Sequence, residues 1–340
     1  MASKGLLLIN LGSPSAPERG AVARYLNEFL MDPFVIDLPS YLRWPLVRLI
    51  ITPFRSQKSA DAYRKVWIEQ GSPLVHFTRL FSEGVKRQLG HQFDVRWAMR
   101  YGKPSIPEVL RNWNVDELFV VPLYPQYAES STRTAVEEVR KFMKSTRSST
   151  RVHVLEDFYV ESEFISEQAN CISERIEAFK PDHILLSFHG LPEHHLTKLY
   201  PQHCLRDSEC CATVTESNRY CYRAQAMATA RALRGKIQFS PEKISLGFQS
   251  RLGRRPWIKP YTDIVIAELA ASGAKRVLVS CPSFVADCLE TLEEIQMRLR
   301  EQFIEAGGEE LELVPALNAS ERWIVQFSQM IERSDLKWKV

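Results

Sequence analysis

Short apolar runs alternate with amphipathic stretches along the whole chain. The runs are rich in aliphatic and β-branched residues, whereas the stretches between them repeat apolar positions every three or four residues. This alternation predicts β-strands and α-helices in βαβ units, and therefore parallel sheets. The predicted strands are 6–10, 95–100, 118–123, 152–155, 184–188, 244–249, 277–281 and 311–315. The predicted helices are 21–30, 72–89, 136–144, 161–179, 224–233, 263–272, 290–306 and 321–332.

Four strands followed by four strands predict an α/β protein with two similar doubly wound, Rossmann-like domains. Each domain is expected to contain a mainly four-stranded parallel sheet. We expect an N-terminal domain at 1–160, a C-terminal domain at 161–319, and a last helix, 320–340, that packs back on the N-terminal domain. Ligands bind beyond the carboxyl ends of parallel strands, so we expect the active cleft between the two domains.

The bulk composition excludes several classes of protein. With 45% apolar and 25% charged residues, the chain is ordinary globular material. The net charge of +3 and the lack of a Lys/Arg block argue against a nucleic-acid partner. The sequence contains neither a signal-peptide pattern nor an apolar run long enough to span a membrane. We therefore expect a cytoplasmic protein, and we leave monomer and homodimer open.

A histidine and an acidic cluster follow two of the predicted strands. His189 directly follows the first of these, 184–188, and Asp287, Glu290 and Glu294 come shortly after the second, 277–281. A histidine, with its ordinary pKa of about 6.5, opposite carboxylates suits proton removal coupled to the handling of a cation. The spacings of three and four residues predict that the acids share one helix face. Two alternatives stay open: a core histidine, and a solvated helix start in which Glu294 pairs with Arg298.

Aromatic and basic residues near the predicted strand ends could bind a flat, anionic ligand. Aromatic faces suit a large π-system, and arginines bind carboxylates through paired hydrogen bonds. For any single aromatic residue, ordinary core packing is the alternative. The candidates are Arg55, Tyr63, Arg100, Tyr101, Tyr124, Tyr127 and Trp257.

Residues 34–54 are strongly apolar but also contain prolines. Pro39, Pro45 and Pro53 are expected to break any long helix. The segment could form an apolar lip for a greasy ligand or a membrane surface, or a lid that packs on its own domain.

Four cysteines lie close together within the polar segment 201–222. Such a group suggests a tetrathiolate iron–sulfur or zinc site, although the spacing differs from that of zinc ribbons. Coincidence without a metal is the alternative. The four residues are Cys204, Cys210, Cys211 and Cys221.

Ordered strings along nearly the whole chain resemble the ferrochelatase family. They include Leu8-Ile9-Asn10-Leu11-Gly12-Ser13-Pro14, Gly71-Ser72-Pro73-Leu74, Arg100-Tyr101-Gly102, Tyr124-Pro125-Gln126-Tyr127, Ser187-Phe188-His189-Gly190, Phe248-Gln249-Ser250-Arg251 and Leu289-Glu290-Thr291-Leu292. The resemblance implies a lyase that inserts ferrous iron (Fe2+), as substrate, into protoporphyrin IX and releases two protons in the terminal step of haem biosynthesis.

The resemblance also implies roles for individual residues. His189 matches the acceptor of pyrrole protons, and Glu290 matches the glutamate opposite it. Asp287 and Glu294 match an acidic line that passes metal or protons, so all four are expected to meet the substrate iron. The implied porphyrin contacts are Leu8, Arg55, Tyr63, Ser72, Arg100, Tyr124 and Trp257.

The chain also departs from the family pattern. Cys288 stands where many members have histidine, and Arg298 stands at an often acidic position. Some bacterial members carry a 2Fe-2S cluster on an internal segment, and the resemblance carries that cluster over to the four cysteines, in a structural or sensing role. Peripheral association with the inner membrane through residues 34–54 is a further expectation. The alternatives are a coproporphyrin ferrochelatase, a cobalt chelatase, and a non-catalytic tetrapyrrole carrier or iron–sulfur sensor.

Overall fold

The computed structural model describes residues 3–202, 204–205, 209–251, 253 and 255–340. The chain divides into two compact units. Unit 1 comprises Met1–Tyr124, Ala128–Asp157 and Ala319–Val340, and unit 2 comprises Pro125–Tyr127 and Phe158–Asn318. Each unit contains one four-stranded parallel sheet, which confirms the predicted fold class. Positions 203 and 206–208 of the predicted cysteine segment lie outside the described residues.

The sheet of unit 1 has the strand order β2-β1-β3-β4. Its strands are β1 (Lys4–Gly12), β2 (Asp94–Tyr101), β3 (Glu117–Pro122) and β4 (Arg151–Val154). Strand β1 lies between two parallel neighbours, with Leu8 in register with Trp97 and Val121. Its continuous burial follows from helices on both faces of the sheet, which is why the strand reads as an unbroken apolar run.

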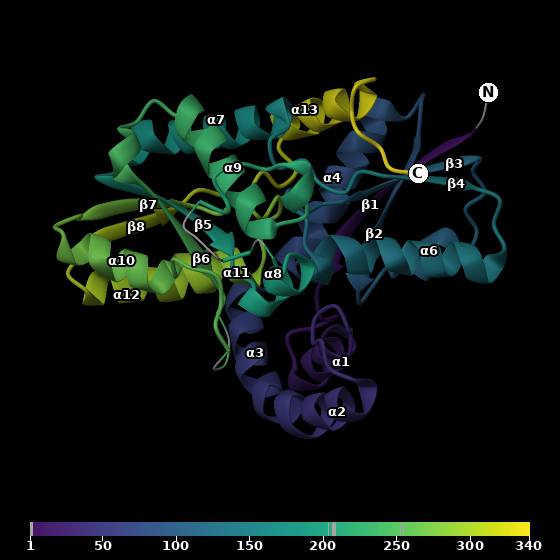
Figure 1. Ribbon diagram of the computed structural model, residues 1–340, viewed down its shortest axis with the longest axis horizontal. Coiled ribbons are helices and arrows are strands. Elements are labelled where there is room, and N and C mark those ends of the chain that lie inside the picture. Colours follow the sequence, from purple (N-terminus) through teal and green to yellow (C-terminus); the bar gives the residue numbers. More distant parts are fainter. Residues whose placement is uncertain (1–2, 203, 206–208, 252, 254) are drawn as a thin grey trace. The chain divides into compact units, whose positions relative to one another are not determined.

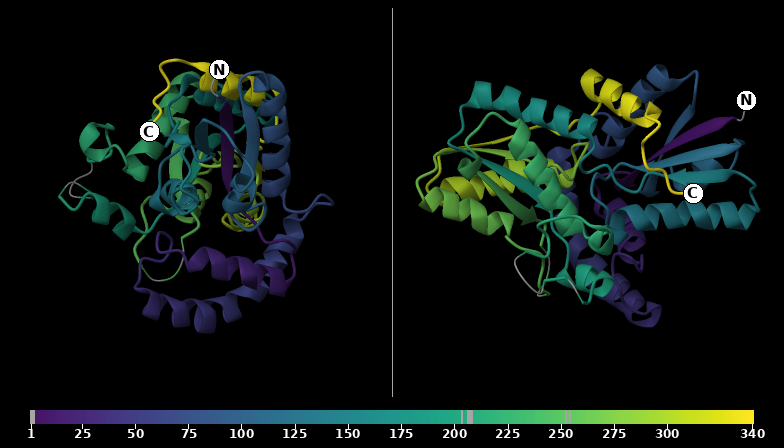
Figure 2. Two further views of the ribbon diagram at one scale, coloured as in Figure 1. Left: turned by 90° about the vertical axis from the view of Figure 1, so that its right-hand side faces the viewer. Right: turned by 45° about the horizontal axis from the view of Figure 1, so that its top comes forward.

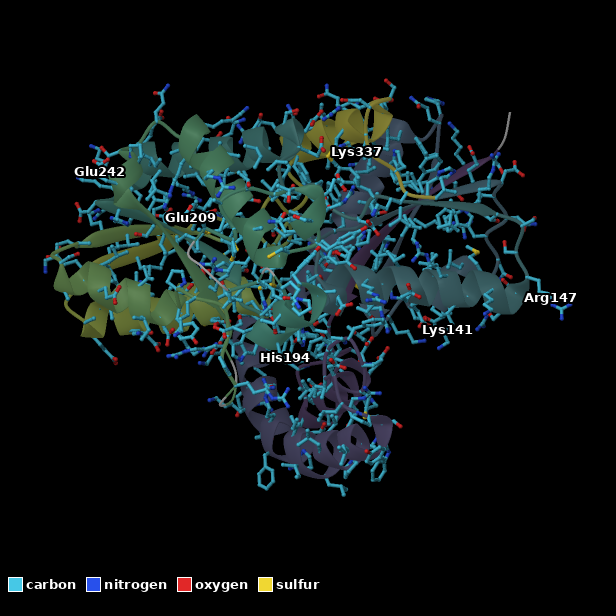
Figure 3. The ribbon with its side chains drawn as sticks, viewed as in Figure 1. Lys141, Arg147, His194, Glu209, Glu242 and Lys337 are labelled. Carbon is cyan, nitrogen blue, oxygen red and sulfur yellow. The ribbon has the colours of Figure 1, made fainter. Side chains whose placement is uncertain are left out.

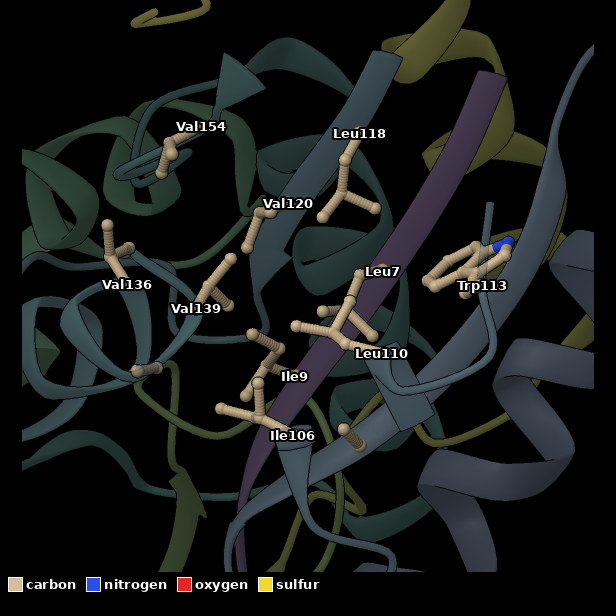
Figure 4. Close-up of a cluster of buried hydrophobic side chains, with 12 residues drawn as sticks. Leu7, Ile9, Ile106, Leu110, Trp113, Leu118, Val120, Val136, Val139 and Val154 are labelled. Carbon is tan, nitrogen blue, oxygen red and sulfur yellow. The ribbon is translucent and has the colours of Figure 1, made fainter. Parts of the chain in front are cut away.

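Helices cover both faces of this sheet (Figure 1). On one face, α4 (Pro73–Leu89) packs against α13 (Glu321–Glu332), where the rings of Phe81 and Trp323 stack with centroids 5.9 Å apart. On the other face, α5 (Ile106–Leu110) and α6 (Thr134–Thr146) enclose an aliphatic core (Figure 4). The core side chains of that face include Leu7, Ile9, Ile106, Leu110, Leu118, Val120, Val136 and Val139.

A helical arm projects from the sheet of unit 1 (Figures 1 and 2). It contains α1 (Arg19–Leu30), α2 (Ser40–Pro45), the π-helical η1 (Leu46–Ile51) and α3 (Thr52–Val66). The prediction that prolines break this region is therefore wrong. Pro39 is the N-cap of α2, and the wide turns of η1 lie between Pro45 and Pro53, where they accommodate proline rings that a regular α-helix would exclude.

The sheet of unit 2 has the equivalent order β6-β5-β7-β8. Its strands are β5 (His183–His189), β6 (Ile244–Gln249), β7 (Arg276–Ser280) and β8 (Glu310–Leu313). Helix α7 (Ser162–Phe179) covers one face together with α9 (Tyr222–Lys236), and α10 (Thr262–Ala271) and α12 (Arg300–Glu305) cover the other (Figure 1). All eight predicted strands are thus confirmed, with ends that differ by a few residues.

Several short helices complete the described chain. The predicted helix 290–306 is helical but divided into α11 (Leu289–Leu292), the π-helical η5 (Glu294–Leu299) and α12. The others are the π-helical η2 (Glu129–Arg133), α8 (Glu193–Leu199), η3 (Glu216–Asn218) and η4 (Pro241–Lys243). None of the described helices combines the length and the apolar composition needed to span a lipid bilayer.

Candidate functional site

The carboxyl end of the unit 2 sheet gathers the chemistry-bearing residues of that unit. His189 is the last residue of β5 and lies in register with Gln249, the last residue of β6. On the other side of β5, strand β7 leads directly into Ser283 and the acidic segment. Because the three strands are parallel neighbours, their last residues lie side by side at the carboxyl end of the sheet.

The backbone fixes the tautomer of His189. Its Nδ1 lies 2.6 Å from the carbonyl oxygen of Gly190, which can only accept a hydrogen bond. Nδ1 therefore carries the proton in the neutral ring, and the lone pair is on Nε2. The ring is half-buried and stands edge-to-face with Phe284, with centroids 6.0 Å apart. The arrangement presents Nε2 as a proton acceptor of fixed orientation.

Glu294 is fixed in place by Ser250. The carboxylate Oε1 accepts the Ser250 amide N–H at 2.7 Å, and Oε2 accepts the Ser250 hydroxyl at 2.6 Å. The pKa of Glu294 is raised, chiefly by burial and also by the charge of Glu290, while the Ser250 hydroxyl bond and the charges of His189 and Arg298 act in the opposite direction. The charges of His189 and Glu290 therefore both act on the Glu294 carboxylate.

Cys288 contacts the neighbouring glutamate, Glu290. Burial raises the pKa of the Cys288 thiol, and the Glu290 carboxylate, which hydrogen-bonds to it, raises the pKa further. The thiol is therefore held neutral and donates to Glu290. The backbone carbonyl of Glu290 also accepts a hydrogen bond from Gln249 Nε2 at 2.9 Å.

Asp287 does not share the helix face of the two glutamates, contrary to the prediction. Helix α11 begins at Leu289, and the buried Asp287 precedes it. Its carboxylate accepts hydrogen bonds from the Thr291 hydroxyl at 2.9 Å and the Asn318 amide at 2.7 Å. Buried carboxylates are stable only when they are hydrogen-bonded, so these donors turn the side chain inward.

Arg298 pairs with a different glutamate from the one considered in the sequence. Its Nε lies 2.8 Å from Glu293 Oε2, while Glu294 is bound to Ser250. In the π-helical turn of η5 the Arg298 N–H bonds to the Glu293 carbonyl, five residues earlier, so Arg298 lies next to Glu293. The four-residue spacing of a regular α-helix would instead place Arg298 next to Glu294.

Residues at the carboxyl ends of β5 and β6 pack closely around the backbone of His189 and Gly190. The sequence contains them in strings that resemble the family but assigns them no structural role. Gly190 donates its N–H to the Gln249 carbonyl at 2.8 Å, and a Cβ at Gly190 would lie 2.6 Å from that oxygen. Gln249 also accepts the Ser187 hydroxyl at 2.8 Å. The half-buried Trp257 forms a β-bridge with Pro192, so the loop 255–258 follows the chain just beyond His189.

Of the predicted ligand contacts in unit 1, Arg55 and Tyr124 offer exposed surface to a ligand, whereas Tyr63 and Ser72 are buried. Arg55 on α3 is half-buried, and burial lowers its pKa. Tyr124 is half-buried, and its hydroxyl has no hydrogen-bond partner among the described residues. Tyr63 is buried on α3 against Trp67, with ring centroids 6.1 Å apart, and Ser72 is the buried N-cap residue of α4.

Two other predicted contacts of unit 1 lack that surface. Leu8 is completely buried inside β1. Arg100 is used internally, because its guanidinium donates to Asp32 at 2.6 Å and to the Thr134 hydroxyl at 2.7 Å. Tyr101 also donates to Asp32, at 2.9 Å. The carboxylate that Arg100 binds is therefore one from the protein itself.

The four clustered cysteines are all buried, and their sulfurs form a hydrogen-bonded series. Cys221 bonds to both Cys204 and Cys211, and Cys210 and Cys211 have their sulfurs 3.6 Å apart. The bond to Cys204 raises the pKa of Cys221 to about 11, and the same bond lowers that of Cys204. Across the described residues, no set of three or more His, Cys, Asp or Glu side chains has the arrangement of a metal site.

Comparisons with known proteins bear on this site. A family model described as ferrochelatase matches residues 3–335. The ferrochelatase of Ectopseudomonas mendocina (strain ymp) is 46% identical over 342 residues, which cover 98% of this chain and 99% of that protein. The ferrochelatase of Coxiella burnetii (strain Dugway 5J108-111) is 44% identical over 335 residues, which cover 97% and 93%.

Among solved structures, SirB from Bacillus subtilis with Fe3+ matches with a TM-score of 0.54 at 11% identity. The match covers 97% of this chain and 94% of that one. At this identity the likeness shows the fold alone.

Proposed function

The chain belongs to the ferrochelatase family and is a metal chelatase of haem synthesis, and on that premise we propose that the sheet edge of unit 2 carries the proton-accepting and iron-handling groups. The observation that supports this most directly is geometric: His189 ends β5 in register with Gln249, and the next residue, Ser250, binds both carboxylate oxygens of Glu294. Ferrous iron is a substrate, which meets these side chains in transit. Imidazole nitrogen and carboxylate oxygen are suitable transient ligands for it.

In the proposed reaction, His189 Nε2 accepts a pyrrole proton as iron enters the ring. The Nδ1 bond to Gly190 keeps Nε2 available and stabilises the imidazolium that forms. Glu290 is the partner carboxylate, and the raised pKa of Glu294 suits it to take up and release a proton. Asp287 is assigned a supporting role, because its oxygens accept hydrogen bonds from Thr291 and Asn318.

For the porphyrin we propose five contacts. A half-buried guanidinium such as Arg55 favours an anionic partner, and a propionate is one. Aromatic side chains suit the macrocycle, and the unpartnered hydroxyl of Tyr124 can accept or donate a hydrogen bond. Leu8 and Arg100 are left out because of their burial and internal bonding. The proposed set is Arg55, Tyr63, Ser72, Tyr124 and Trp257.

We propose protoporphyrin IX as the porphyrin. The exposed apolar side chains of the arm, among them Tyr41 and Phe54, favour the less polar ring over coproporphyrin, which carries more carboxylates. Turnover on the two porphyrins, compared at equal ferrous iron, decides between them. Faster turnover on coproporphyrin would reverse the assignment.

We propose that the four cysteines hold a 2Fe-2S cluster. Support comes from their burial and from the contacts that join all four sulfurs into one series. Four thiolates are the usual ligands of such a cluster. When bound, the cluster would cross-link the cysteine segment and make it responsive to iron and oxygen. It would supply no electrons to metal insertion, which transfers none.

We further propose that the helical arm contacts the inner face of a membrane, with the rest of the protein in the cytoplasm. The most exposed large apolar side chains of the described chain, apart from the C-terminal Val340, lie on this arm. Tyr41 is 74% exposed, Leu49 61% and Phe54 80%. An exposed apolar patch of this kind is typical of an interaction surface.

The function is tested by anaerobic insertion of ferrous iron into protoporphyrin IX, followed through loss of the free-porphyrin spectrum. His189→Ala is expected to lower turnover by roughly 10²–10⁴-fold while porphyrin binding is retained. His183→Gln is the matched control, because His183 lies at the opposite end of the same strand and bonds to Ser245. Porphyrin binding without turnover in the unaltered protein would favour the carrier.

A further inference from the structure

One chain of contacts runs from the cysteine segment to the backbone of His189. Cys221 is the N-cap of α9, and Tyr222 is the first residue of that helix. The Tyr222 hydroxyl lies 2.8 Å from the Ser283 hydroxyl, and Ser283 Oγ accepts the His189 backbone N–H at 3.3 Å. We infer that Tyr222 and Ser283 are positioning residues that connect the state of the four cysteines to the placement of His189.

Burial makes this connection rigid. Tyr222 is only 6% exposed, and its hydroxyl has the Ser283 hydroxyl as its hydrogen-bond partner. A buried hydroxyl without a partner is costly, which favours the Ser283 bond strongly over its absence. The next residue, Phe284, packs its ring against His189, so residues 283 and 284 contact both the backbone and the side chain of the histidine.

A second connection joins the N-terminal end of the cysteine segment to α8. The chain leaves His189 through α8 and reaches Tyr200, whose carbonyl accepts the Cys204 N–H at 2.9 Å. The Tyr200 hydroxyl accepts the Tyr220 N–H at 2.8 Å. In Figure 3, His194 marks α8 and Glu209 marks the turn before the cysteine pair. The segment is thus tied at both ends to elements that begin or end beside His189.

The inference rests on the proposed function, since it takes His189 as the proton acceptor and the cysteines as cluster ligands. Iron binding would convert the hydrogen-bonded thiols into metal-bound thiolates, with release of their protons to solvent, and Cys221 would be held by the metal instead of by its neighbouring sulfurs. Because Cys221 adjoins Tyr222, a displacement of Cys221 would move the start of α9, and the two hydroxyls would carry the change to the His189 amide. Placement matters, because small displacements of a catalytic group lower turnover markedly.

The test follows the His189 amide resonance in protein labelled with ¹⁵N-histidine. Cys221→Ser removes one thiol but supplies a residue that is favoured at an N-cap, so α9 is expected to keep its start. The substitution should shift the His189 resonance in the parent chain. That shift should be lost when Tyr222→Phe or Ser283→Ala is also present, and kept with Tyr25→Phe, which removes a buried hydroxyl bonded to Gly12 in unit 1.

Kinetics provide a second readout. Ser283→Ala should lower kcat roughly tenfold with little change in the porphyrin KM, and Ser283→Thr, which keeps a hydroxyl, should restore it. If Ser283→Ala does not fold, Tyr222→Phe, which removes a single oxygen atom, replaces it, with the same expected fall in kcat and the same small change in KM. A Cys221→Ser shift that is absent, or equal in all backgrounds, overturns the inference.

Failure of this inference is distinguishable from failure of the proposed function. Iron and sulfide content and metal insertion are measured on the same preparations. A protein that lacks iron but shows the coupling refutes the cluster and supports the connection. A protein that holds iron and inserts metal without coupling overturns the connection alone.

Discussion

Ser250 donates two hydrogen bonds to Glu294, one to each carboxylate oxygen, at 2.7 and 2.6 Å. Ser250 adopts a positive φ of 68°, a conformation uncommon for a residue with a side chain. That backbone directs both the amide and the hydroxyl toward the acid. Such strain persists only where the surroundings impose it, and it occurs most often at functional sites.

Ser250→Ala should change the pH dependence of metal insertion. The hydroxyl bond lowers the pKa of Glu294 against the effect of burial, so its removal raises that pKa further. The ionised carboxylate then requires a higher pH, and the acidic limb of the kcat profile should move upward. Ser272→Ala, at the exposed C-cap residue of α10, serves as the control. An unmoved acidic limb would mean that Glu294 does not titrate during turnover.

Asp32→Asn should destabilise unit 1. The Asp32 carboxylate is buried and accepts hydrogen bonds from Arg100, Tyr101 and Thr134. Removal of one partner of a buried ion pair leaves an uncompensated charge and costs about 3–5 kcal/mol. The free energy of unfolding in denaturant measures it. Asp61→Asn breaks an exposed pair and should cost no more than about 1 kcal/mol; equal losses in both would argue against a special role for Asp32.

Cys211→Ser should abolish cluster assembly. The unaltered protein is expected to contain iron and inorganic sulfide in equal amounts and to absorb visible light before any porphyrin is added. Cys211 has another cluster cysteine on either side in the sulfur series, so its loss interrupts the set. Cys171→Ser, on α7, should leave iron and sulfide unchanged. Zinc without sulfide in the unaltered protein would replace the cluster with a zinc site.

Phe54→Ser and Leu49→Ser should weaken binding to vesicles of phosphatidylethanolamine and phosphatidylglycerol. Burial of one such side chain contributes about 1.5–3 kcal/mol, so each change should lower partitioning roughly tenfold or more. Ile264→Ser is the control, since Ile264 is also exposed but belongs to α10 of unit 2 and not to the arm. Equal effects of all three substitutions, or no vesicle binding by the unaltered chain, would exclude the arm as a membrane contact.

The sequence predicted most regular elements because their signals are local. A central parallel strand such as β1 is buried on both faces, and its apolar run is visible without any partner. The π-helical turns of η1 and η5 were missed, because three- and four-residue spacing does not distinguish a widened turn from a regular one. The same limit misplaced Asp287, which lies before α11 and faces Asn318.

The sequence by itself determined which segments along the chain form strands, the position of His189 at the end of one strand, and the family to which the chain belongs. These follow from local periodicity, covalent adjacency and ordered strings. Only the tertiary structure decided which side chains are already bonded within the protein. Glu294 and Ser250 are 44 residues apart, and Arg100 and Asp32 are 68 apart. Such pairings depend on how strands and loops converge in space, which no local pattern of residues encodes.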